Sequence, residues 1–233
     1  MTRLTRPIVI VLASAQRRGA EIQGAGLASM LVQRGHDAVA VALEPGTGAS
    51  TLDVRVLGTS ARSASMLRVL RRELSGAIVV AHGSTTLPAV AIATLGTRIP
   101  WVYRSIGDPE AWVRGPLHRA RTAALLARAE RVVTLWDAAA VSMQRLYRVP
   151  ARRLLVIPNS RAPALFTPIS PAERLTARET LGVDGPVVLY LGALSEEKRP
   201  LDAVRAIAGL AGVTLIVAGR GSKTPALSDG VYR

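Results

Sequence analysis

Short runs of uniformly apolar residues alternate along the chain with longer stretches in which apolar residues recur every three or four positions. The first kind of run predicts buried β-strands, and the second predicts helices with one apolar face. Strands are expected at 7–14, 38–43, 54–58, 76–83, 99–108, 131–135 and 153–160, and helices at 20–34, 60–74, 87–95, 117–129 and 137–148. Asp137 is expected to cap the last of these helices. Because strands that are apolar throughout and alternate with helices are typical of parallel sheets covered on both faces, the pattern predicts an α/β fold.

A proline-rich stretch interrupts this alternation near residue 160. Residues 158–172, PNSRAPALFTPISPA, contain four prolines and few strand-forming residues, which is typical of an inter-domain linker. A helix at 171–181, a strand at 187–191, a helix at 200–210 and a strand at 213–218 follow. A single β-α-β crossover leaves both sheet edges open. We therefore predict a first domain over residues 1–160, a linker over 161–172 and an incomplete second domain over 173–233.

The composition narrows the chemistry available to the protein. The 233 residues are 49% hydrophobic, enough for a sizeable core, and they include no cysteine. Without cysteine there are no disulfides, thiolate metal ligands or cysteine nucleophiles, so a cytoplasmic location is expected. His36, His82 and His118 are scattered, and no metal site is predicted. The first apolar run, Ile8–Ala15, is too short to span a bilayer and is interpreted as the first strand.

Charge is the most unusual bulk property. The formal net charge is +14, and arginine supplies all but two of the 30 basic residues. Such a charge attracts the phosphates of nucleic acids, anionic lipids and nucleotides without choosing among them. No helix-turn-helix signature and no aromatic stacking platform are present, so no specific nucleic acid partner is expected.

The stretch 60–74 predicts a basic amphipathic helix. Met66, Leu67, Leu70 and Leu74 share one face, opposite Arg62, Arg68 and Arg72. Two interpretations stay open. The apolar face can pack on the sheet, which is the interpretation favoured here, or it can lie on anionic lipid. The second would make the protein a non-catalytic acceptor- or membrane-binding module, peripheral to the inner face of the membrane.

Polar clusters follow four of the predicted strands. Ligands of open parallel sheets bind beyond the carboxyl ends of the strands, close to helix N-termini. The residues found there are Arg18, Gly19, His82, Arg104, Ser105, Asp108, Glu197 and Lys198. Taken singly, each has a structural explanation, such as a turn glycine, a buried histidine or a solvated helix start. Their recurrence at the same end of two successive sheets favours a cleft that binds anions.

Several catalytic motifs are absent. There is no G-x-S-x-G elbow, and no G-x-G-x-x-G fingerprint follows the first strand. The stretch GRGSKT at 219–224 follows a strand and imitates a P-loop, but Ser222 interrupts the Gly-Lys-Thr order and Pro225 follows at once. We do not interpret it as a nucleotide-binding loop.

Five segments, in order along the chain, resemble the retaining glycosyltransferases of family 4. They are RGAEIQGAGLASMLVQRGHDAVAV (18–41), VVAHG (79–83), ARAERVVTLWDAAAVSMQRLYRVPARRLLVIPNS (127–160), the F-x-P of Phe166 and Pro168, and LGALSEEKRPLDAVRAI (191–207). The resemblance implies a GT-B type fold, in which a Rossmann-like parallel-sheet domain is followed by a second Rossmann-like domain, here partial. It implies transfer of a sugar from a UDP- or GDP-linked donor to a sugar or lipid acceptor, without a cofactor.

The resemblance also assigns roles to the candidate residues. Lys198 is the counterpart of a cation that grips the donor diphosphate, a sensible arrangement because the leaving group is anionic. Gly19 and Glu197 complete the expected donor-binding set. His82 and Asp108 are the expected catalytic residues, and Arg18, Arg104 and Ser105 are expected on the acceptor or pocket rim.

The chain also departs from the family pattern. Ala193 stands where an arginine is usual, Gly107 stands where a histidine is common, and no two glutamates have the E-x7-E spacing. The resemblance therefore implies a truncated, split or degraded enzyme. Such a chain would transfer sugar weakly or not at all by itself, and a separate C-terminal half would be a natural partner.

Overall fold

The computed structural model of the chain describes residues 5–47, 51–160, 167–219, 221 and 230–232. Two compact units make up the chain, Met1–Ser160 and Arg161–Arg233. Of the residues singled out in the sequence, Phe166 and most of the GRGSKT stretch lie outside the described part.

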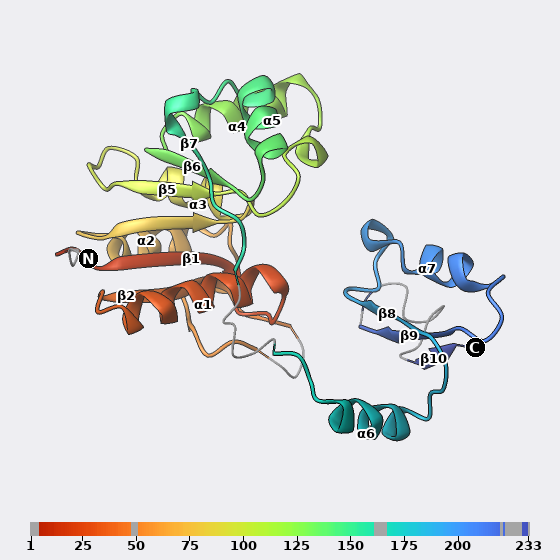
Figure 1. The fold of residues 1–233 in the computed structure, drawn as a ribbon. Helices are drawn as coiled ribbons and strands as arrows, with labels where there is room; N and C mark the ends of the chain where they lie inside the picture. The colour runs from red at the N-terminus through yellow and green to blue at the C-terminus, as the bar shows by residue number, and fades with distance from the viewer. Residues whose placement is uncertain (1–4, 48–50, 161–166, 220, 222–229, 233) are drawn as a thin grey trace. The chain divides into compact units, whose positions relative to one another are not determined.

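Unit 1 (Met1–Ser160) is built around one seven-stranded sheet in the order β3-β2-β1-β4-β5-β6-β7 (Figure 1). The neighbouring strands in this sheet pair in parallel, as the alternating pattern predicts. Its elements are β1 (Ile8–Ser14), α1 (Gly19–Gln33), β2 (Ala38–Glu44), β3 (Arg55–Val56), α2 (Ala64–Glu73), β4 (Ile78–His82), α3 (Thr86–Ala93), β5 (Trp101–Arg104), η1 (Glu110–Trp112), α4 (Pro116–Leu126), β6 (Arg131–Thr134), α5 (Asp137–Tyr147), η2 (Ala151–Arg153) and β7 (Leu154–Val156).

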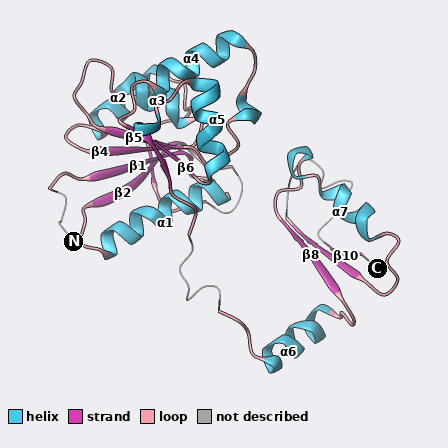
Figure 2. Cartoon of the chain, turned by 45° about the horizontal axis from the view of Figure 1, so that its top comes forward, coloured by secondary structure: helices cyan, strands magenta, loops and turns pink. Residues whose placement is uncertain are grey.

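Helices cover both faces of this sheet, as Figure 2 shows for α1 on one side and α2 to α5 on the other. Successive strand residues point to opposite faces, so β1 serves both layers. Val9 and Val11 join the larger cluster with α2, α3, α4 and α5. Ile8, Ile10 and Leu12 pack against α1. This architecture confirms the predicted α/β class.

The apolar face of α2 belongs to the core. Met66, Leu70 and Leu74 are completely buried, and the half-buried Leu67 packs against the same cluster. Ser63 caps the helix by accepting a hydrogen bond from the Met66 backbone N–H at 3.1 Å. The interpretation in which these side chains insert into a membrane is therefore wrong, because the sheet already covers them. Among the described residues, no helix combines the length and the hydropathy that a membrane crossing requires.

Two local predictions in unit 1 need correction. The strand expected over 99–108 ends at Arg104, and a short 3-10 helix, η1, follows within the loop. Asp137 was expected to cap its helix, but Trp136 occupies the cap position and Asp137 is the first helical residue. An acidic residue in the first turn still stabilises the helix through its dipole, so the same sequence signal has a different geometry.

Unit 2 (Arg161–Arg233) contains a three-stranded sheet in the order β10-β9-β8. Its elements are α6 (Pro171–Leu181), β8 (Val187–Leu191), η4 (Glu196–Lys198), α7 (Pro200–Ile207), β9 (Thr214–Ala218) and β10 (Gly230–Tyr232). The β8-α7-β9 crossover is parallel, as predicted. The expectation of two open edges is wrong at one of them, because β10 pairs antiparallel with β9.

The core of unit 2 lies on a single face of its sheet. Leu194, Leu215 and Val217 form the buried cluster, with Tyr190 and residues of α7 packed against it. On the opposite face Leu189 and Leu191 are 59% and 77% exposed. No residue of α6 is buried among the described residues of the unit.

Candidate functional site

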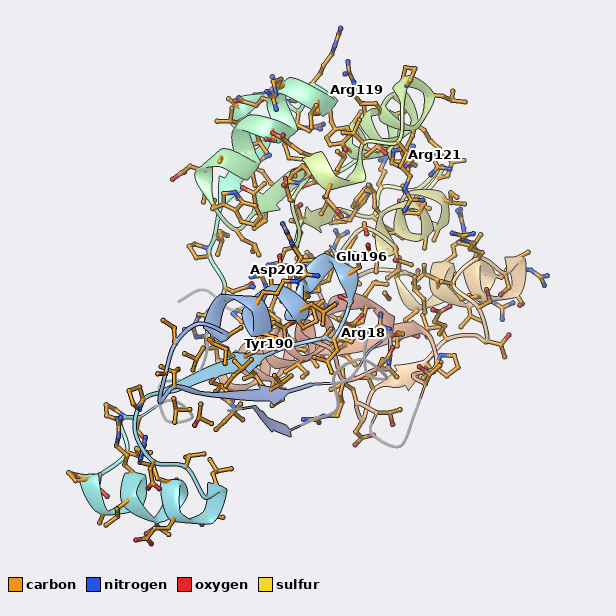
Figure 3. The ribbon with its side chains drawn as sticks, turned by 90° about the vertical axis from the view of Figure 1, so that its right-hand side faces the viewer. Arg18, Arg119, Arg121, Tyr190, Glu196 and Asp202 are labelled. Atoms are coloured by element: carbon orange, nitrogen blue, oxygen red, sulfur yellow. The ribbon has the colours of Figure 1, made fainter. Side chains whose placement is uncertain are left out.

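The turn between β1 and α1 forms the first part of the site. Arg18 takes the cap position in an extended conformation, and α1 begins at Gly19. The first backbone N–H groups of a helix have no intrahelical acceptor and carry the positive end of its dipole. A Cβ atom added at Gly19 would meet no heavy atom within 4 Å. The approach to these N–H groups is therefore open, and Arg18 adds a formal positive charge beside it (Figure 3).

Glu21 lies in the first turn of α1 and is nearly completely buried. Burial raises the pKa of its carboxyl group, while its own backbone N–H and the nearby Arg18 act in the opposite direction. Its Oε2 atom is buried and has no hydrogen-bond partner among the described residues. A buried, unsatisfied carboxylate oxygen costs free energy.

His82 ends β4 beneath this first turn and is 2% exposed. Its Nε2 atom lies 2.9 Å from the Ala20 carbonyl oxygen, to which it donates a hydrogen bond in the neutral ring. Burial, together with the smaller effect of the nearby Arg104 charge, lowers the pKa of His82 to about 4. His82 is therefore neutral at pH 7, and it connects the end of β4 to the start of α1.

Gly24 lets α1 approach this histidine closely. A Cβ atom at position 24 would collide with Leu12 Cδ2 and would lie 3.3 Å from His82 Cδ2. The glycine five residues after Gly19 therefore lets α1 lie close to β1 and β4. In the sequence Gly24 had no assigned role, because the spacing of the glycines does not match the dinucleotide fingerprint.

Arg104 and Ser105 lie at the end of β5, next to His82. The register pairs His82 with Arg104 across the two strands. The Arg104 Nη2 atom donates to Asn159 Oδ1 at 2.8 Å, and burial lowers the pKa of the guanidinium group. Ser105 is buried and its Oγ donates to the Gly107 carbonyl oxygen at 3.3 Å. This part of the site thus contains a buried cation held by the last residues of unit 1.

Asp108 lies further along the same loop and is exposed. Its Oδ1 atom accepts a hydrogen bond from the Glu110 backbone N–H at 2.9 Å, so it caps the short helix η1. Tyr147 holds the same loop by donating from its hydroxyl group to the Pro109 carbonyl oxygen at 3.0 Å. These contacts give Asp108 a structural role, and its predicted catalytic role stays a prediction.

Glu197 and Lys198 belong to unit 2. They lie in η4, and Lys198 Nζ forms an ion pair with Glu197 Oε1 at 3.0 Å, with both side chains largely exposed. The Tyr190 hydroxyl group donates to the carbonyl oxygens of Ala193 and Lys198 and so holds the turn from the core side (Figure 3). An exposed pair of this kind contributes little to stability, and the predicted donor-binding role of Glu197 and Lys198 stays a prediction.

The structure brings together the candidates of unit 1 in one region, the carboxyl edge of β1, β4 and β5. Arg18 and Gly19 lie at the start of α1, His82 lies below that turn, and Arg104 and Ser105 follow on the next strand. Sequence reasoning missed Glu21, Gly24 and the contact of Asn159 with Arg104. The apolar surroundings of Glu21 were the available signal, since an acidic residue in a helix that packs on a sheet is unusual.

No group of three or more histidine, aspartate or glutamate side chains within the described ranges is arranged to hold a metal ion. The arrangement in unit 1 instead has the features of an anion site, with a helix N-terminus, an arginine next to it and an open approach.

A family profile described as "Glycosyl transferase 4-like domain" matches residues 18–160. The match begins at Arg18 and ends at Ser160, so it includes every candidate residue of unit 1. The chain belongs to the glycosyl transferase 4-like domain family. The resemblance noted in the sequence is therefore confirmed. A search of curated protein sequences finds no match.

Several solved structures have the same fold as this chain, which confirms the expected GT-B type. HepE from Anabaena, in complex with UDP and glucose, is 21% identical and superposes with a TM-score of 0.77 over 93% of this chain. A glycosyltransferase from Rickettsia africae is 12% identical with a TM-score of 0.63 over 95% of the chain. MnaA from S. aureus, in complex with UDP, is 15% identical with a TM-score of 0.62 over 95% of the chain. This chain spans 61%, 70% and 63% of those three proteins, respectively.

Proposed function

We propose that the protein is a glycosyltransferase that takes a sugar from a UDP-linked donor by a retaining reaction, alone or with a further C-terminal part. Family membership supports the class of reaction. The choice of UDP draws on HepE and MnaA, both solved in complex with UDP. The observation that carries the proposal is the open helix N-terminus at Gly19, with Arg18 beside it, in the region matched by the family.

In this proposal the charges stabilise the departing nucleoside diphosphate. As the bond between sugar and phosphate breaks, negative charge grows on the phosphate oxygens, and positioned cations and helix N–H groups lower its energy. Gly19 and the start of α1 would face the phosphates, with Arg18 on the rim. Lys198, next to Glu197, keeps its proposed role as a cation for the donor diphosphate, and Ala193 stands where a second cation is usual.

The remaining residues hold the reactive region in place. His82 is neutral and bonded to the Ala20 carbonyl oxygen, which suits a positioning residue for the first turn of α1. Arg104 and Ser105 lie behind it at the end of β5, and Asp108 follows in the loop. We propose a location inside the cytoplasm, where nucleotide sugars are available as substrates.

A charge placed at Gly19 tests the proposal directly. Gly19→Asp adds a carboxylate where no atom would obstruct it, so the unit should fold normally. An acidic residue in the first turn even stabilises a helix. Isothermal titration with UDP should show binding to the wild-type chain and a loss of at least about tenfold in the variant, because a like charge would oppose the diphosphate.

Gly26→Asp is the matched control. Gly26 lies in the same helix, is exposed, and also leaves a Cβ atom without neighbours within 4 Å. The control should bind UDP as the wild type does. Equal loss in both variants, or no UDP binding by the wild-type chain at millimolar concentration, would overturn the proposal.

A further inference from the structure

A groove of about 590 Å³ lies on the face of unit 1 that α2, α3 and α4 cover, and its lining does not include the open turn at Gly19. Residues from the start of α2, from α3, from the loop at 111–114 and from α4 line it. None of the lining residues is acidic, and about half of the lining is apolar. The groove combines apolar walls with several cations.

The topology gives the groove a polar end and an apolar end. In a parallel sheet with right-handed crossovers, the helix after each strand starts at the carboxyl edge and runs back along the sheet. Ser84 and Thr85 therefore lie at the carboxyl edge, immediately after His82, whereas Ile92 lies near the far end of α3. On the neighbouring helices the same rule places Arg62 and Arg114 towards the edge, and Leu67 and Leu125 further along.

The cations of the groove are available to a ligand. Arg62, Arg114 and Arg121 form no ion pair among the described residues. Glu110, next to the lining residue Ala111, directs its carboxylate elsewhere, accepting from Arg145 at 2.6 Å and from Ser142 at 2.7 Å. The groove thus has an excess of three positive charges that nothing on its walls balances.

Arg121 and Arg119 make it possible to distinguish binding in the groove from attraction to the positively charged surface in general. Residues two positions apart on a helix point to different sides, and only Arg121 lines the groove. Figure 3 shows the two labelled arginines of α4 projecting in different directions. This pair therefore provides a variant and a control of the same residue type on the same helix.

We propose that this groove binds the acceptor, and that the acceptor is a lipid phosphate. The phosphate would lie at the carboxyl edge, against Arg62 and Arg114, beside the loop that follows His82. The alkyl chain would run along α3 over Leu67, Ile92 and Leu125. A chain laid along the eight residues of α3 would have about 12 Å of groove. The assignment as an acceptor rests on the proposed glycosyl transfer, whereas the binding of an alkyl phosphate does not.

Soluble alkyl phosphates test the proposal without requiring transfer. Titration of the full chain with octyl phosphate, butyl phosphate, octyl glucoside and inorganic phosphate separates charge from chain length. Octyl phosphate should bind best, because each methylene buried in the groove improves affinity by roughly fourfold. Butyl phosphate should bind more than tenfold less tightly, and neither octyl glucoside nor inorganic phosphate should bind at the same concentration.

Variants locate the site. Arg62→Gln with Arg121→Gln should weaken octyl phosphate binding by about tenfold or more, whereas Arg119→Gln should leave it unchanged. Ile92→Ser should also weaken binding, while Leu117→Ser, on an exposed leucine of α4 outside the groove, should not. All five positions are exposed, so each variant should keep the wild-type unfolding temperature.

The outcomes distinguish the groove from the proposed function. If the wild-type chain binds octyl phosphate, the groove variants do not, and UDP does not bind, the groove proposal stands and the nucleotide-sugar proposal is rejected. Equal binding of octyl phosphate and octyl glucoside would reject a phosphate-selective site. Binding of inorganic phosphate as tight as that of octyl phosphate would show an anion site only, and loss of binding in Arg119→Gln would show general charge attraction. Either result would overturn the lipid assignment.

Discussion

The two units of the chain use the same local pattern and reach different degrees of burial. In unit 1, helices cover both faces of the sheet, and β1 buries side chains in two clusters. In unit 2, α7 packs on one face, and Leu189 and Leu191 are exposed on the other. Local periodicity therefore determines where strands and helices form, whereas burial depends on how many layers the rest of the fold supplies.

The largest expected difference between the units concerns a leucine in each. Leu70 is 0% exposed in α2 and Leu191 is 77% exposed in β8. Leu70→Ala should lower the free energy of unfolding of unit 1 by about 2–5 kcal/mol, because it leaves a cavity in the larger cluster. Leu191→Ala should change the stability of unit 2 by less than about 0.5 kcal/mol.

Separate probes can follow the two units in these variants. The three tryptophans lie at 101, 112 and 136, so tryptophan fluorescence in urea reports on unit 1 alone. Hydrogen exchange of the β8 and β9 amides reports on unit 2. A comparable cost for both substitutions would mean that the exposed face of unit 2 is covered in solution.

The next effect should make unit 1 sensitive to acid. The folded-state pKa of His82 is about 4, below its ordinary value of 6.5, so between these values the unfolded chain binds more protons. Stability should therefore fall as the pH falls from 6.5 towards 4, and the loss at pH 5 should be about 2 kcal/mol relative to pH 7.5.

His82→Gln removes this titration and is the matched variant. Urea unfolding at pH 7.5 and pH 5, followed by tryptophan fluorescence, should show a smaller change in the variant than in the wild type. An unchanged difference between the two pH values would assign the acid sensitivity to other groups.

A smaller effect concerns the boundary of unit 1. Asn159→Ala removes the acceptor of the Arg104 hydrogen bond and leaves a partly buried guanidinium group with one partner fewer. We expect a loss of about 1 kcal/mol in unit 1, since Asn159 itself is exposed and water can replace it in part. Gln23→Ala is the control, because its side chain makes an exposed hydrogen bond to the Ser160 carbonyl oxygen in the same region and its loss should cost less. Equal effects would show that the Arg104 contact is not special.

The smallest effect is expected in α6 of unit 2. Ser170 and Glu173 form a capping box, with Ser170 Oγ accepting from the Glu173 backbone N–H at 3.2 Å. Because no residue of α6 is buried, its helix depends on such local contacts. Ser170→Ala should cost about 0.5 kcal/mol of local helix stability, seen as faster hydrogen exchange in α6. A change in the tryptophan-monitored unfolding of unit 1 would contradict this.

Most of the fold followed from the sequence. The sequence pattern predicted the order of strands and helices along the chain and the parallel pairing of the strands. The uniformly apolar runs at 38–43 and 76–83, which form β2 and β4, both pair in parallel with β1. The strand expected over 99–108 was too long, because its apolar pattern continues past Arg104 into a loop held by side-chain contacts of Asp108 and Tyr147. The contact of Tyr147 with Pro109 joins residues far apart in the sequence, and periodicity does not record it.

The candidate site was predicted less completely than the fold. The rule that ligands bind at the carboxyl edge located Gly19, His82 and Arg104 in the same region. It could not show that His82 is buried under α1, nor that Gly24 makes room for it, because both depend on the distance between a helix and a sheet. The groove along α3 was also missed, since its walls come from three helices whose side chains the sequence does not bring together.

The absence of a side chain at Gly24 has a consequence for how substitutions act in evolution. Position 24 lies outside the proposed anion site, yet a methyl group there would collide with Leu12 and crowd His82, so the start of α1 or these side chains would have to move. The distance between the Arg18 turn and the neighbouring strand ends would then shift without any alteration of the residues that face them. A substitution at this buried position would therefore change the affinity for an anion at that turn, although the residue itself does not face the anion.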